Sequence, residues 1–123
     1  MWFDALKTVA AEYSDVDGAW GDTDCCQFIN SYYSELHGID HADQFDYAGG
    51  TGALKILSKH GGMKGLLTHV LGEPKDRYPG CIVTVDLGDE SVGCGVYNGY
   101  CVFAILPEKG LVRISPEKIK DAW

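Results

Sequence analysis

The spacing of apolar residues changes once along the chain, between Pro74 and Gly80, and this change constrains the fold more than any other sequence feature. Before it, apolar residues recur at the spacing of amphipathic helices. After it, they form short runs typical of strands. Because 123 residues is the size of one compact domain, we expect a single α+β domain over residues 1–123, with N-terminal helices packed on a C-terminal antiparallel β-meander.

The same patterns, together with turn residues, predict the individual elements. Helices are expected over Trp2–Tyr13, Cys25–His37, Ala53–His60 and Met63–Leu71. Strands are expected over Cys81–Leu87, Gly93–Tyr97, Tyr100–Leu106 and Leu111–Ser115, and a last helical turn within Pro116–Ala122. Asn98-Gly99 is typical of a two-residue hairpin turn, which would place Tyr97 opposite Tyr100.

Charge and hydropathy exclude several classes of function. The chain has 10 Lys and Arg against 18 Asp and Glu, a formal net charge of −8. Such a surface repels phosphate backbones and the sequence has no basic patch, so we expect no nucleic-acid partner. No run approaches the roughly 18 apolar residues of a membrane span, and the residues after Met1 do not resemble a signal peptide. We expect a protein made in the cytosol, and kept there or released by lysis.

The five cysteines are an odd number and contain no C-x-x-C pair. This pattern favours neither a disulfide framework nor a zinc site. In the expected hairpin, Cys94 and Cys101 are diagonal neighbours, about 7 Å or more apart at Cα, which is a poor separation for a disulfide. We interpret the cysteines as small buried hydrophobic residues in a reducing compartment, and we expect no metal and no cofactor.

Cys25 is the candidate for chemistry. Asp24 is a typical N-cap and Gln27 completes a capping-box pattern, so Cys25 falls at the first helical position. A thiolate there is stabilised by unpaired backbone N–H groups and by the positive end of the helix dipole. Asp22 and Asp24 oppose this effect, because negative charge raises the pKa of a thiol.

Two segments, one of which contains this cysteine, resemble segments of a known superfamily. Gly21-x-x-Asp24-Cys25 leads into a helix, and Gly93–Gly99 is similar to a strand of the type His-Val-Gly-Ile-Tyr-x-Gly. Both resemble NlpC-type, papain-like cysteine peptidases, which cut peptide bonds in bacterial cell walls and recur in phage tails. A phage-encoded family of this superfamily is more similar still, through Trp20-Gly21, Tyr47, Gly52-Ala53-Leu54, His60-Gly61-Gly62 and Ala122-Trp123.

The resemblance implies a papain-like fold with an incomplete catalytic set. Cys25 matches the nucleophile, but Gly93 stands where the general-base histidine belongs. The third, orienting residue would come from Val102–Ala104, which is apolar, and Cys81 replaces the usual Asp after Gly80. Without a base to protonate the leaving amine, hydrolysis should be severely impaired. Gly93 and Gly95 would then serve to let the Cys25 helix approach the sheet.

Two other clusters carry weaker signals. His37, Asp40, His41 and Asp43 have metal-ligand residue types, but we interpret them as a solvated helix end and loop. Gly49–Gly52 precedes an expected helix and could hold an anion there, or could be a plain helix-entry loop. Tyr32, Tyr33 and Tyr47 are interpreted as core or interface aromatics.

These observations leave three hypotheses. The resemblance implies a phage virion-associated structural or assembly protein of the tail or neck, assembled in the host cytoplasm, whose partners are other phage structural proteins. The alternative is an active cysteine peptidase or amidase that cleaves peptidoglycan peptides with Cys25 as nucleophile, using a base that the sequence does not predict. The third is an acidic interaction module that binds a host protein, on the charge of −8.

Overall fold

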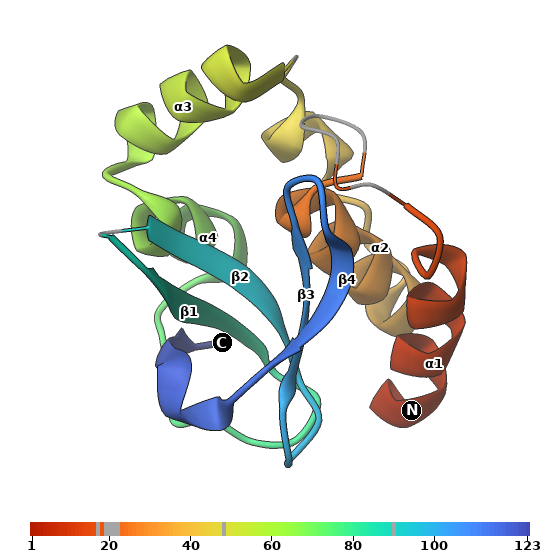
Figure 1. Cartoon of the computed structure of the whole chain (residues 1–123). Helices are drawn as coiled ribbons and strands as arrows, with labels where there is room; N and C mark the ends of the chain where they lie inside the picture. Colours follow the sequence, from red (N-terminus) through yellow and green to blue (C-terminus); the bar gives the residue numbers. More distant parts are fainter. Residues whose placement is uncertain (17, 19–22, 48, 90) are drawn as a thin grey trace.

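The computed structural model describes residues 1–16, 18, 23–47, 49–89 and 91–123. Four α-helices come first, and a five-stranded sheet follows (Figure 1). The helices are α1 (Trp2–Glu12), α2 (Cys25–His37), α3 (Gly49–His60) and α4 (Met63–Leu71). The strands are β1 (Ile82–Gly88), β2 (Ser91–Tyr97), β3 (Val102–Leu106), β4 (Gly110–Ile114) and β5 (Ile119–Ala122). Short 3-10 helices lie at Ala42–Phe45 (η1) and Pro116–Lys118 (η2). The α+β layout is therefore confirmed.

The sheet has the order β4-β3-β2-β1-β5, with antiparallel neighbours throughout. The prediction of a helical turn within Pro116–Ala122 is correct only for η2, because the residues after it form β5. Its residues instead pair with β1, where Val83 lies opposite Ala122. Between β4 and β5 the chain crosses from one edge of the sheet to the other by way of η2 (Figure 1). Because β5 has only four residues and pairs with β1, which is far from it in the sequence, it leaves little periodic signal in the sequence.

The β2–β3 hairpin also differs from the prediction. Tyr97 lies opposite Val102 instead of Tyr100. The Asn98 backbone N–H donates to the Cys101 carbonyl at 3.0 Å, and the Asn98 side-chain oxygen accepts from the backbone N–H groups of Tyr100 and Cys101. The turn therefore lies one residue later than expected, with Gly99 at φ 97°. The residue opposite Tyr97 changes by two positions, so each side chain of the hairpin stays on the face of the sheet where it was expected.

The two faces of the sheet carry separate clusters of buried residues. On the first face, Ile82, Cys94 and Val96 join the core formed with the helices. α2 contacts β2 and β3 there, and α4 contacts β2, whereas α3 lies farther from the sheet and contacts α4 (Figure 1). The second face holds Cys81, Val83, Val85, Val102 and Ala122. Ile114 and Ile119, at the two ends of the crossing segment, pack against this second cluster.

Gly93 and Gly95 lie on the second face, which corrects the expectation that they make room for the Cys25 helix. Gly95 pairs with Val83 and Ala104, and Gly93 pairs with Val85. A Cβ atom at Gly95 would come within 2.3 Å of the Phe103 carbonyl oxygen. The small residue at position 95 is needed by the neighbouring strand, and the side chain that meets α2 is that of Cys94.

Candidate functional site

Cys25 is the first residue of α2, as predicted. The Asp24 carboxylate accepts a hydrogen bond from the Gln27 backbone N–H at 3.0 Å, which is the expected cap. The helix ends at Gly38 in the left-handed conformation, φ 70°, also as predicted. The Gln27 side-chain amide donates to the Phe45 carbonyl at 2.8 Å and so holds η1 against α2. Trp20, Gly21 and Asp22 of the motif lie outside the described residues.

Cys25 belongs to a cluster of three buried thiols. The Sγ atoms of Cys25, Cys26 and Cys94 all lie within 4.8 Å of one another. Their exposed fractions are 7%, 4% and 0%. The cluster therefore joins two adjacent residues of α2 to one residue of β2. Sequence reasoning named Cys25 but missed its partners, because neither their spacing nor their order along the chain forms a recognised motif.

The three thiols of the cluster have pKa values that are shifted in different directions. Thiol donors on Cys26 and Cys94 hold the pKa of Cys25 well below its usual value, against the opposing effect of burial. The hydrogen bond to Cys25 raises the pKa of Cys26, and burial raises the pKa of Cys94. The N-terminal end of α2, where the helix dipole is positive, also favours negative charge on Cys25.

Asp24 and Tyr47 buttress the start of α2. The Tyr47 hydroxyl donates to the second carboxylate oxygen of Asp24, which is buried. Burial, with the nearby Cys26 and Asp24, raises the pKa of Tyr47, so this phenol remains a donor. The sequence indicates a core or interface aromatic at Tyr47, and the structure adds that its hydroxyl offsets part of the cost of burying the Asp24 carboxylate.

A pocket of about 460 Å³ opens beside Cys25. It is walled mostly by apolar side chains from α3, α4 and the strands, and Asp24 and Cys25 also line it. Gly93, the position that matches the catalytic base, and Ala104, from the segment expected to supply the third residue, also line it and bring no polar side chain. All four histidines are among the described residues, and none of them lines this pocket. The arrangement can hold a thiolate but offers it no imidazole.

The histidines lie in two other places. His37 and His41 flank the Tyr33 ring, with centroid distances of 4.4 and 5.0 Å. His60 and His69 stack on each other between α3 and α4, at 4.6 Å. The residue types of the expected His37, Asp40, His41 and Asp43 cluster do not converge. Across the part of the chain that the structure describes, the thiols are the one group placed to share an ion.

Asp40 has a structural role instead. Its carboxylate accepts from the Asn30 amide at 2.9 Å and from the Ala42 backbone N–H at 2.8 Å, and these bonds lower its pKa. Gly49–Gly52 is likewise structural, because it forms the first turn of α3 rather than a loop before it. α3 therefore begins four residues earlier than predicted.

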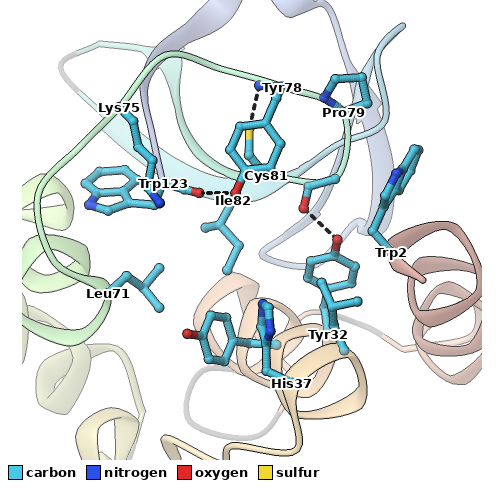
Figure 2. Close-up of a pocket in the computed structure, with 13 residues that line it drawn as sticks. Trp2, Tyr32, His37, Leu71, Lys75, Tyr78, Pro79, Cys81, Ile82 and Trp123 are labelled. Carbon is cyan, nitrogen blue, oxygen red and sulfur yellow. Dashed lines mark hydrogen bonds between the residues drawn. The ribbon is translucent and has the colours of Figure 1, made fainter.

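A second hollow, of about 380 Å³, lies beside the C-terminal half of α2. Figure 2 shows Trp123 and Lys75 on one side, Trp2 on the other, and Tyr32 and His37 reaching in from α2. Tyr32 donates to the Gly80 carbonyl at 2.5 Å, and the Tyr78 hydroxyl donates to the Trp123 carbonyl at 3.1 Å (Figure 2). The first bond ties α2 to the segment before β1, and the second ties that segment to the residue that follows β5, so the hollow marks a junction of the fold.

The fold and the site define a class: an α+β domain in which a helix N-terminal cysteine lies among buried thiols beneath an apolar pocket. A family model described as "Domain of unknown function (DUF6950)" matches residues 1–123, and the chain belongs to this family. No curated protein and no solved structure matches the chain. None of the described helices has both the length and the apolar character needed to cross a bilayer.

Proposed function

We propose that the protein is a non-catalytic structural or assembly component of a phage particle, in the tail or neck, built on an NlpC-like domain. One observation supports the proposal that the domain is not catalytic. Cys25 begins a helix beside a pocket, as a nucleophile would, but the chain's histidines lie elsewhere. The phage setting comes from the sequence resemblance of Cys25 and its flanking motif, and the partners would be other phage structural proteins.

The environment of Cys25 supports this reading chemically. Peptide hydrolysis needs a group that takes the thiol proton and returns it to the leaving amine. The carboxylate that lines the same pocket, Asp24, already accepts hydrogen bonds from the Gln27 N–H and the Tyr47 hydroxyl. Cys26 and Cys94 are thiols, whose weak basicity and burial make them poor proton relays.

The test is the composition of purified particles of a phage that encodes this chain. We expect quantitative mass spectrometry to find the chain in the particles at a fixed copy number, retained through density-gradient purification. Particles that lack the chain would contradict the proposal. The amount of a non-virion phage protein in the same preparation measures carry-over from the lysate.

The alternative is an active cysteine hydrolase that acts on peptidoglycan peptides, and the lowered pKa of Cys25 is the observation that favours it. It predicts that wild-type protein releases peptides from peptidoglycan and that Cys25→Ser stops the release. Cys81→Ser is the matched control, because Cys81 is a buried thiol on the second face of the sheet. Under our proposal neither the wild type nor the variants release peptides from any peptidoglycan type.

Alkylation provides a second discrimination. Iodoacetamide labelling of folded, metal-free protein, followed by peptide mass spectrometry, measures the rate at each cysteine. A nucleophile open to substrate would make Cys25 the fastest of the five. We expect the partly exposed Cys101 to be labelled fastest and Cys25 to be slow, since its side chain is buried.

A further inference from the structure

Neither proposed function uses the three thiols together. Cys25, Cys26 and Cys94 come from two elements that are far apart in the sequence, and yet their sulfur atoms lie within 4.8 Å of one another. A fourth sulfur is adjacent, because the Met63 Sδ atom lies 3.9 Å from the Cys26 Sγ atom. Met63 begins α4 and is buried. Three elements therefore bring four sulfur atoms to one buried point.

The spacing of the thiols suits a shared ion. Sulfur atoms bound to one Zn²⁺ at about 2.3 Å lie about 3.8 to 4.0 Å apart. Each pair in the cluster would close to that spacing with shifts of about 1 Å or less. Because two of the cysteines are neighbours on a well-formed helix and the third lies on a central strand, these positions are held before any ion arrives.

The surroundings favour a soft cation. Thiolate and thioether ligands select Cu⁺ and Zn²⁺ over the hard cations, which need several oxygen ligands. The three cysteines and Met63 lie within the hydrophobic core that the helices form on the first face of the sheet. The N-terminal end of α2, where the dipole is positive, offsets part of the negative charge of the thiolates.

We propose that Cys25, Cys26 and Cys94 form a binding site for one soft closed-shell cation, Cu⁺ or Zn²⁺, with Met63 beside it. Each thiol that becomes a ligand gives its proton to solvent, and no group is oxidised or reduced. Cys25 also lines the pocket beside α2, which gives the ion a route to the cluster. The Met63 thioether favours Cu⁺, whereas the smaller residual negative charge favours Zn²⁺.

The experiment is a metal titration of the full chain, reduced, freed of metal and kept anaerobic. Cu⁺ and Zn²⁺ are added separately in competition with a chromogenic chelator, and native mass spectrometry counts the bound ions. We expect one ion per chain, and the tighter of the two identifies the cation. Replacing Cys25, Cys26 or Cys94 with Ala, one at a time, should weaken binding by about 100-fold or more, beyond the usual effect of losing an outer-shell partner.

Two matched variants serve as controls. Cys81→Ala removes a thiol that is equally buried but lies on the second face of the sheet, and it should leave the affinity unchanged. Met63→Leu keeps the buried volume and removes the thioether, and it should weaken Cu⁺ binding by about tenfold while leaving Zn²⁺ binding unchanged. If Met63→Leu weakened the binding of both ions equally, or of neither, Met63 would not be a ligand of the site.

A measurement on wild-type protein keeps the proposal testable if a cysteine variant fails to fold. The bound ion should slow alkylation of Cys25, Cys26 and Cys94 and leave Cys101 unaffected. Absence of any retained ion, or protection that falls on Cys81 or Cys101 instead, would overturn the proposal. The result does not depend on the chain's place in a phage particle, so the two proposals fail separately.

Discussion

At the scale of single residues, neighbouring positions on β2 have opposite roles. Cys94 faces α2 and completes the thiol cluster, whereas Gly95 faces the second cluster of buried residues. Gly93, which stands at the position of the expected base, lies on the same face as Gly95. A comparison by motif alone treats these three positions as one segment, but the pleat of the strand separates them.

The two glycines allow a matched test. Gly95→Ala should lower the free energy of unfolding by about 1 to 3 kcal/mol, because its Cβ would meet the Phe103 carbonyl, which cannot move without disturbing β3. Gly93→Ala should be nearly neutral. Its nearest neighbour, at 2.9 Å, is a methyl of Leu87 that can rotate away, and the lost flexibility of the unfolded chain compensates. Urea denaturation of both variants measures the difference, and equal losses would contradict the assigned packing.

At the scale of elements, local signals predicted α2 completely and the strands only in part. Asp24, Gln27 and Gly38 act within a few residues of the helix ends, so the sequence is sufficient to place them. The hairpin register depends on which of two adjacent turns forms, and Asn98 selects the later one through its side chain. β5 and the thiol cluster depend on contacts with β1 and β2, which no local pattern encodes.

The residue that follows β5 is the subject of the next prediction. Trp123 is buried, its backbone N–H donates to the Ile82 carbonyl, and its indole N–H donates to the Gly72 carbonyl at 2.8 Å. Trp123→Ala should destabilise the protein by about 3 to 5 kcal/mol, because it empties a large buried volume. Trp123→Phe keeps most of that volume and loses the indole bond, so it should cost about 1 to 2 kcal/mol.

Thermal unfolding followed by circular dichroism measures both Trp123 variants. Tyr100→Ala is the control, since that ring is 87% exposed and its loss should change stability by less than about 0.5 kcal/mol. Equal stability of Trp123→Ala and wild type would mean that the indole does not hold β5 in place.

At the scale of the whole molecule, one sheet separates two cores that share its strands. β1 gives Ile82 to the helix side and Val83 and Val85 to the other side. The chain crosses the sheet from β4 to β5 to close the second core. Sequence patterning predicts that the strands exist. It does not reveal that both faces of the sheet are covered, because only a few residues cover the second face.

Shared strands predict that the two cores unfold together. Leu67→Ala removes a fully buried side chain on the helix side and should cost about 2 to 5 kcal/mol. Val85→Ala removes one on the opposite side and should cost about 2 kcal/mol. Since either loss weakens the same strands in a chain shorter than about 150 residues, each variant should shift one cooperative transition without changing its denaturant slope.

The measurement is urea unfolding followed in parallel by tryptophan fluorescence and far-ultraviolet circular dichroism. Coincident curves are expected for the wild type and for both variants. If Val85→Ala produced an early transition in one probe only, the second core would be an independent unit. In that case β5 and the crossing segment could open while the helices remained packed on β2, and the cysteine cluster would persist in a partly unfolded chain.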